Sequence, residues 1–182
     1  MKKVTYVIFL STFWFIVIHP QLLNADGEQK LPCRISDYVA SSNVALDKIK
    51  NCVEKEAGDV NEANNMIKSS GLYLASYFGR LDIVKYLVEH GANVNQADIY
   101  NRTPLMMACC NQEFRPEVRG ARPYTQIAKY LIDHGANVNA RASLGDKTTP
   151  TPLGCTKNGI STEWYKPDPE LIKYLKSHGA TE

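Results

Sequence analysis

The feature that most constrains this chain is a segment that recurs three times along it. Residues 83–95 and 127–139 agree at most positions, and residues 171–180 are a third copy. A fainter copy occupies residues 57–61, and the strong copies follow one another at a spacing of 44 residues. Recurrence of this kind indicates a repeat architecture, because one such unit buries its apolar face only against its neighbours.

Each copy predicts an amphipathic helix. In the first copy Ile83 and Leu87 are four residues apart, which places both on one apolar stripe. Gly91 then suits the left-handed residue that ends a helix. His90 precedes it, and we expect this side chain in the last turn, beside the negative end of the helix dipole.

A second helix precedes each strong copy. Thr103 and Thr151 are each followed by a proline, which fits a helix cap and a first helical residue. Ser70 begins a degenerate version, and Asp168 with Pro169 begins the last helix. The chain is therefore predicted to be all-α, built from about four helix–turn–helix units with short connecting turns.

The Thr-Pro-Leu helix, the second helix and the Gly-Ala-Asn-Val-Asn turn together resemble the ankyrin-repeat family, over about residues 44–180. The resemblance implies an ankyrin-repeat domain at 36–182 whose first and last units act as caps. The units span about 36–64, 65–97, 98–140 and 141–182.

One family feature is missing from the first helices. Tyr73, Met106 and Gly154 stand where the family carries a histidine, which puts in doubt the usual hydrogen-bond network between successive turns. Units three and four also hold extra residues, near 113–124, 142–147 and 160–167, where loops tolerate them. The first of these insertions is either a partner-specific loop or a surface loop with no role.

The N-terminal residues predict a signal peptide at 1–25. Lys2 and Lys3 precede an apolar run at 4–18, and Ala25 supplies a small residue before the cleavage point. A membrane-spanning helix needs about 20 apolar residues, so a cleaved signal is favoured over an anchor. We expect a periplasmic or secreted protein with an irregular arm at 26–35. Only an uncleaved signal would hold the chain at a membrane.

Charge argues against nucleic acid as a partner. Removal of Lys2 and Lys3 takes the formal net charge from +2 to zero. The densest basic stretch, 115–122, is interrupted by Glu117. Phosphate binding needs clustered lysines and arginines, which this chain lacks.

The residues needed for catalysis are also missing. His90, His134 and His178 occupy one position of the repeat, where helix-end chemistry explains them. There is no Cys-x-x-Cys pair for zinc and no glycine-rich phosphate loop. We therefore expect no enzyme activity, no cofactor, no metal and no small-molecule substrate.

Five cysteines follow the predicted cleavage site, so at least one cannot pair within the chain. We favour a bridge between Cys33 and Cys52, both outside the clearest repeats, although the sequence does not fix the connectivity. Cys109 is expected to be a small buried side chain. Cys110 could instead be an exposed thiol that bridges to another molecule.

The family resemblance implies a protein partner on the concave face, which the turns and first helices form. The matching turn positions are Met66, Ile67, Ser69, Ile99, Tyr100 and Arg102, and the matching positions late in the first helices are Tyr77, Phe78, Cys110 and Asn111. Tyrosine, phenylalanine and arginine often anchor interfaces. The alternative is that Tyr77 and Phe78 pack against a neighbouring unit or an insertion.

The sequence thus predicts an exported protein-interaction module with no enzymatic role. Two alternatives remain open. One is a redox or structural envelope protein that works through a free thiol, and the other is a secreted effector that acts in a host.

Overall fold

Eight helices form in the part of the chain that the computed structural model describes. The described residues are 33–40, 45–56, 58–64, 66–110, 123–143, 150–158 and 167–181. The helices are α1 (Ile35–Ala40), α2 (Leu46–Lys55), α3 (Gly71–Tyr77), α4 (Leu81–Glu89), α5 (Pro104–Cys110), α6 (Tyr124–Asp133), α7 (Pro152–Asn158) and α8 (Pro169–Ser177). No strand forms among these residues, so the all-α prediction is confirmed. The predicted signal peptide and most of each insertion lie outside the described residues.

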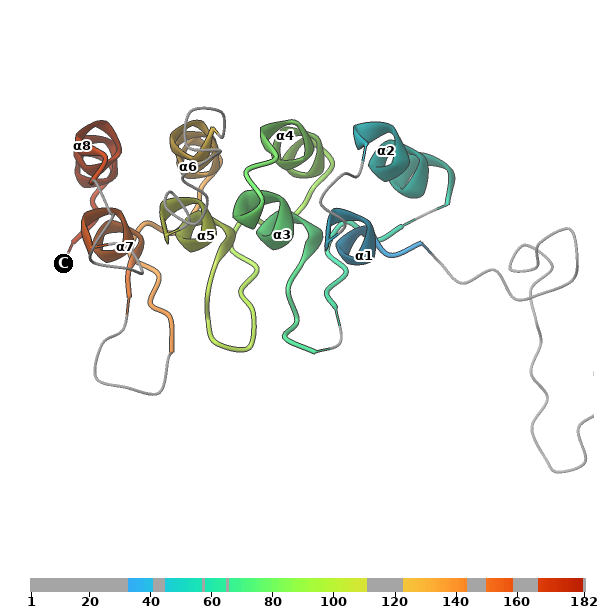
Figure 1. The fold of residues 1–182 in the computed structure, drawn as a ribbon, viewed down its shortest axis with the longest axis horizontal. Helices are drawn as coiled ribbons and strands as arrows, with labels where there is room; N and C mark the ends of the chain where they lie inside the picture. The colour runs from blue at the N-terminus through green and yellow to red at the C-terminus, as the bar shows by residue number, and fades with distance from the viewer. Residues whose placement is uncertain are drawn as a thin grey trace, which may run out of the picture. The chain divides into compact units, whose positions relative to one another are not determined.

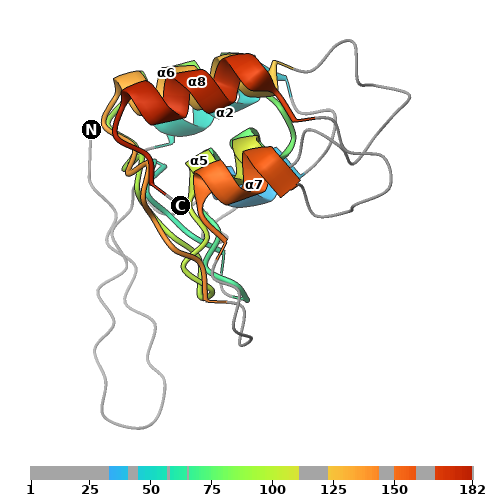
Figure 2. The same ribbon diagram turned by 90° about the vertical axis from the view of Figure 1, so that its left-hand side faces the viewer.

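The helices alternate between two layers (Figure 1). We call α1, α3, α5 and α7 the inner layer, and α2, α4, α6 and α8 the outer layer. Along the stack, the helices of each layer superpose on one another (Figure 2). Each inner helix packs against the next inner helix, from α1 on α3 to α5 on α7, which gives a solenoid of four helix pairs.

Side-chain caps begin three of the inner helices, as the sequence predicts. The N–H groups of Tyr73 and Met106 donate to the hydroxyls of Ser70 (3.2 Å) and Thr103 (3.3 Å). The corresponding bond in α7 joins the Gly154 N–H to Thr151 (3.0 Å). In the outer layer, Asp168 caps α8 by accepting from the N–H groups of Glu170 and Leu171, and Pro169 is its first residue. These bonds satisfy amides that would otherwise lack a partner at the helix start.

Glycines in the left-handed conformation end three of the four outer helices, α4, α6 and α8. Gly91, Gly135 and Gly179 have φ angles of 86°, 87° and 85°, a region that a side chain strongly disfavours. His90, which precedes Gly91, is the C-cap residue of α4. It therefore lies one position beyond the last helical turn, in which the sequence predicts it. Nδ1 of His90 lies 2.8 Å from the carbonyl oxygen of Tyr86. Because that oxygen can only accept, Nδ1 must carry the proton.

The core is a continuous apolar layer between the two rows of helices. Its largest fully buried side chains are Ile35, Ile49, Leu72, Ile83, Leu87, Leu105, Met106, Ile127, Leu131, Leu153, Leu171 and Leu175. The predicted boundary of the N-terminal arm is wrong by one residue, because Ile35 is the first residue of α1 and fully buried. A methyl group added at Gly71 would lie 2.6 Å from the Cγ2 atom of Ile35, so α1 and α3 approach closely there.

Asparagines connect the successive turns. Asn95 donates from Nδ2 to the Gly135 carbonyl oxygen (3.0 Å), and its Oδ1 accepts the Asn137 N–H (2.7 Å). Asn61 makes the same two bonds to Gly91 and Asn93, and Asn139 makes them to Gly179 and Thr181. We call this series the asparagine ladder.

The outer layer carries a second series, which we call the tyrosine ladder. The Tyr86 ring stacks on His90 with centroids 3.9 Å apart, and Lys50 of the preceding outer helix lies 5.9 Å from the ring centre. The Tyr86 hydroxyl donates to Glu54 (3.1 Å). The same stacking recurs between Tyr130 and His134 and between Tyr174 and His178. In both cases a lysine of the preceding outer helix lies over the tyrosine ring.

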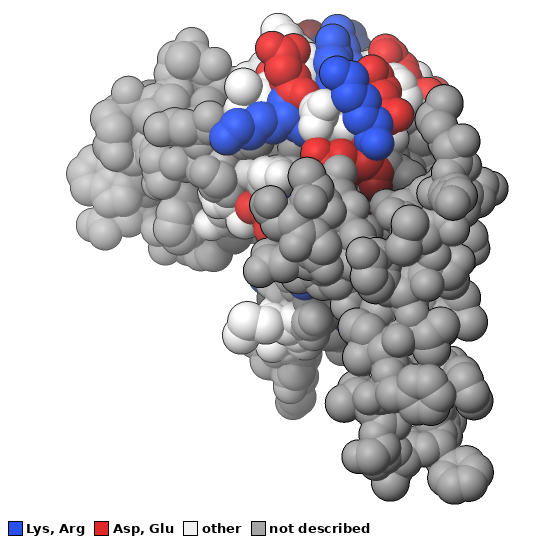
Figure 3. Space-filling view, turned by 90° about the vertical axis from the view of Figure 1, so that its right-hand side faces the viewer, with Lys and Arg blue, Asp and Glu red and all other residues white. Residues whose placement is uncertain are grey.

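The end of the stack formed by α2 has a mixed charged surface (Figure 3). On this helix Lys48 and Lys55 are exposed among the carboxylates of Asp47 and Glu54. Ile49 and Cys52 are fully buried beneath them, which is the division expected of a terminal repeat. Among the described residues, no helix has both the length and the apolar character that a membrane crossing requires.

Candidate partner-binding surface

Three turns leave the helical layers on the same side, at the starts of α3, α5 and α7 (Figures 1 and 2). We call them the first finger (residues 58–70), the second finger (91–103) and the third finger (135–151, described except for 144–149). Backbone hydrogen bonds connect neighbouring fingers. The Ile99 N–H donates to the Ile67 carbonyl oxygen (3.1 Å), and the Ser143 N–H donates to that of Tyr100 (2.7 Å). The three fingers therefore form one continuous surface.

The second finger is organised around the buried carboxylate of Asp98. Its Oδ1 accepts the N–H groups of Tyr100 and Arg102, both at 2.9 Å. Its Oδ2 accepts from Nε of Arg102 at 2.7 Å and from a terminal guanidinium nitrogen at 2.6 Å. Asn101, between these residues, has a φ of 56°, which asparagine tolerates better than most residues. The carboxylate thus fixes the backbone of this turn.

The Arg102 guanidinium lies near two aromatic rings. Its central carbon is 5.0 Å from the centre of the Tyr100 ring and 5.8 Å from that of Tyr73, within cation–π range. Arg102 therefore connects the buried Asp98 to an exposed tyrosine at the finger tip.

Tyr73 occupies the position of the missing family histidine in the second unit. The guanidinium carbon of Arg102 lies 5.8 Å from the centre of its ring, so α3 still contacts the second finger. Burial, opposed by the charge of Arg102 and assisted by Asp98, raises the pKa of the Tyr73 hydroxyl far above its ordinary value. At Gly154 there is no side chain to make the equivalent contact.

The finger tips expose large apolar side chains. Met66 is 88% exposed, Ile99 is 49% exposed and Tyr100 is 42% exposed. Ile67 and Arg102 are half-buried beside them. The structure thus brings five of the ten predicted partner-binding residues together on one surface, and their role in binding stays a prediction.

Tyr77 and Phe78 lie apart from that group, at the opposite end of α3. Tyr77 is 38% exposed, and its ring meets the Phe78 ring edge-on with centroids 5.0 Å apart. The Tyr124 hydroxyl at the start of α6 donates to the Tyr77 carbonyl oxygen (3.1 Å). These residues form a second exposed aromatic position, about 10 Å along the helix from the fingers.

Two predicted surface residues are buried. Ser69 is completely inaccessible and accepts a hydrogen bond from the Asn64 amide (2.6 Å) inside the first finger. Cys110 is the last residue of α5, all of whose residues are buried, and it forms a disulfide with Cys155 of α7. Their assignment to a docking surface is therefore wrong. Asn111 lies outside the described residues.

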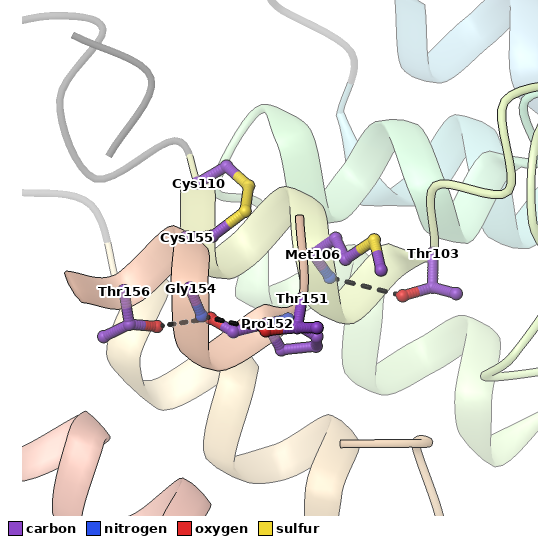
Figure 4. The surroundings of a disulfide bond; sticks show 8 residues. All are labelled: Thr103, Met106, Cys110, Thr151, Pro152, Gly154, Cys155 and Thr156. Carbon is purple, nitrogen blue, oxygen red and sulfur yellow. Dashed lines mark hydrogen bonds between the residues drawn. A yellow bond between two sulfur atoms is a disulfide. The ribbon is translucent and has the colours of Figure 1, made fainter. Parts of the chain in front are cut away.

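The Cys110–Cys155 bridge joins the inner helices of units three and four (Figure 4). The Cα atoms are 4.8 Å apart across a sequence separation of 45 residues. Cys33 and Cys52 are each disulfide-bonded, and a bridge between the two stays a prediction. Cys109 is the free cysteine among the described residues and is buried, as expected, so the hypothesis of an exposed working thiol is wrong there. Burial raises the pKa of Cys109 to about 12.

Sequence reasoning missed Asp98, Tyr73 and Cys155 as determinants of this surface. The role of Asp98 could have been predicted, because an aspartate in a turn, four residues before an arginine, can accept hydrogen bonds from the backbone N–H groups that follow it. The sequence held no signal for the role of Cys155, because its disulfide partner lies in another unit, on the other side of an insertion. Among the described residues, no three histidines, cysteines or carboxylates gather as a metal site would require. What the surface offers is exposed apolar and aromatic contact area on fixed backbone.

Comparison with known proteins agrees with this architecture. A family model described as ankyrin repeats (3 copies) matches residues 38–142, more than half of the chain. No curated protein matches the sequence.

Proposed function

The chain belongs to the ankyrin-repeat family, and from that premise we propose that it binds a protein partner through its three fingers. Ankyrin repeats are generally protein–protein interaction modules, and the family is typically non-enzymatic. The observation that carries the proposal is the row of exposed apolar side chains, Met66, Ile99 and Tyr100, on fingers held together by backbone hydrogen bonds.

Two physical arguments support these residues as the contact surface. Methionine and aromatic side chains are enriched in interfaces, where they supply large contact area. The second finger is also ordered before any partner arrives, because Asp98 already accepts two backbone N–H groups. A preorganised surface loses less conformational entropy on binding.

We further propose that the chain is exported, to a periplasm or outside the cell. The charged start, the apolar run at 4–18 and Ala25 support a cleaved signal peptide. The disulfide between Cys110 and Cys155 also fits an oxidising compartment. Sequencing the N-terminus of the protein from fractionated cells should give Asp26 as the first residue. Recovery of an intact Met1 form from the cytosol would contradict export.

The binding proposal is tested with a finger variant and a matched control. Ile99→Ala with Tyr100→Ala removes exposed area from the second finger and leaves Asp98 and Arg102 in place. Tyr38→Ala removes a tyrosine that is 36% exposed on α1 and is not part of any finger. Each tagged protein is cross-linked in envelope extract of the source organism, and captured proteins are identified by mass spectrometry.

We expect the wild type and the Tyr38 variant to capture the same partner, and the finger variant to lose it. Circular dichroism checks that all three proteins are equally folded. Capture of the same partner by the folded finger variant would contradict the assignment of the fingers as the binding surface.

A further inference from the structure

We propose that the Cys110–Cys155 disulfide determines whether the fourth unit stays docked on the third, so that a reducing environment releases the last repeat. The bridge connects α5 to α7, the inner helices of these two units. The proposal rests on the stack alone, and it stands whatever the partner of the fingers is.

The first observation concerns the packing of α7 on α5, which leaves a gap at Gly154 beside the disulfide. All seven residues of α5 are buried. In α7 the buried residues are Pro152, Leu153, Cys155 and Thr156. The disulfide therefore adds a covalent link to an interface that is already packed. A methyl group built at Gly154 would meet nothing within 4 Å except the Thr151 hydroxyl at 3.3 Å. No neighbour therefore packs closely over that position, and the disulfide replaces the missing contact.

The second observation is that α8 buries two leucines, Leu171 and Leu175, and that its polar contacts to α6 lie at the surface. Lys129 pairs with Glu170, whose side chain is 72% exposed, and the Tyr174 hydroxyl donates to the exposed Asp133. Exposed ion pairs of this kind contribute little to stability. Because a last unit has a neighbour on one side only, the terminal pair α7 and α8 is the easiest part of the stack to release.

Release of α7 would also affect the third finger. The Ala142 N–H donates to the Pro150 carbonyl oxygen (3.2 Å), directly before the Thr151 cap of α7. The neighbouring Ser143 N–H holds the finger to Tyr100. Reduction of the disulfide would therefore also loosen the hydrogen bond that holds the third finger to the second.

The chemical step is reduction by a dithiol. Two electrons and two protons pass to the Cys110–Cys155 bond, which breaks to give two thiols, while the reductant closes its own disulfide. Both cysteines are only 5% exposed, so the reductant reaches them when the last unit opens. Cys109, next to Cys110, is fully buried in the closed stack, and mass spectrometry of the alkylated thiols would detect any exchange with the bridge.

The test is regional hydrogen exchange of the full chain, with and without dithiothreitol. Cys33→Ser with Cys52→Ser leaves Cys110–Cys155 as the remaining bridge. The matched variant, Cys110→Ser with Cys155→Ser, lacks it. Alkylation and mass spectrometry report which thiols are free in each sample.

We expect dithiothreitol to speed exchange in α7 and α8 of the first variant by up to about 1000-fold, the population change that loop-closure entropy gives for a loop of this size. Exchange in α3 and α4 should stay unchanged. In the matched variant, α7 and α8 should exchange fast from the start and should not respond to dithiothreitol.

Unchanged protection of α7 and α8 with both thiols alkylated would overturn the proposal. Equal loss of protection in α3 and α4 would overturn it too, because the stack would then open as one body. The wild type treated with dithiothreitol gives the same regional readout, so the test does not depend on the variants folding.

Discussion

Asp98 and Gly154 show how a single residue decides the strength of one unit. Asp98 is a buried acceptor that holds the backbone of the second finger and the Arg102 side chain, whose guanidinium lies near the Tyr73 ring of α3. Gly154 stands at the position in α7 that corresponds to Tyr73 in α3. The side chain at this helix position therefore contacts the next finger in the second unit, while Gly154 offers no side chain for such a contact.

Replacing Asp98 should be costly. Asp98→Ala leaves Arg102 without its carboxylate and two backbone N–H groups without an acceptor, and we expect a loss of about 3 kcal/mol in the free energy of unfolding. Asp82→Ala is the control, because Asp82 pairs with Arg80 while 46% exposed and should cost about 0.5 kcal/mol. Urea unfolding followed by circular dichroism measures both. Equal losses would show that burial of Asp98 is unimportant.

Two glycine substitutions should have opposite effects. Gly154→Ala adds a good helix former where only the Thr151 hydroxyl is near, and we expect a gain of about 0.5 kcal/mol. Gly71→Ala places a methyl group against Ile35 and should lose about 2 kcal/mol through overpacking. Thermal unfolding of the two variants beside the wild type decides this. Stabilisation by both would mean that α1 moves aside freely.

At the scale of elements, the tyrosine ladder makes the outer layer sensitive to high pH. Burial and the bond to Glu54 raise the pKa of Tyr86 to about 12, against about 10 in an unfolded chain. The folded state therefore holds this proton longer. Its contribution to stability is complete below pH 10 and is lost as the pH rises to about 12.

Tyr86→Phe tests this dependence. We expect the variant to be less stable than the wild type at neutral pH, because it loses the Glu54 bond. Its stability should also fall less steeply between about pH 10 and 12. Urea titrations across that window supply the slopes. Parallel slopes for the two proteins would assign the alkaline loss to other groups.

The sequence predicted elements well where the signal was local. Thr103, Thr151 and Asp168 marked helix starts, and Gly91 and its copies marked helix ends, because a cap and its helix are adjacent in the chain. The burial of Ser69 and Cys110 could not be predicted from neighbouring residues in the sequence. It depends on side chains in other units, which the spacing of the repeats does not specify.

For the whole molecule, the Cys110–Cys155 disulfide is a covalent constraint between two different repeats. Removing it with Cys110→Ala and Cys155→Ala should cost about 4 kcal/mol, the loop-closure value for a separation of this size. Cys109→Ala is the control, since it deletes a buried thiol without opening a bridge, and should cost about 1 kcal/mol. Denaturant unfolding without reductant compares them. A loss for the double variant no larger than that of the control would show that the bridge adds nothing.

The asparagine ladder bears on how such a chain can change its length. Asn61, Asn95 and Asn139 use the same two amide atoms toward the same two backbone groups of the following turn. In these two bonds, the three boundaries between units are chemically alike. A duplicated or deleted unit would therefore meet a matching asparagine donor and acceptor at both junctions, whereas a pairing that crosses one boundary only, such as Cys110–Cys155, would have to be conserved or lost with its unit.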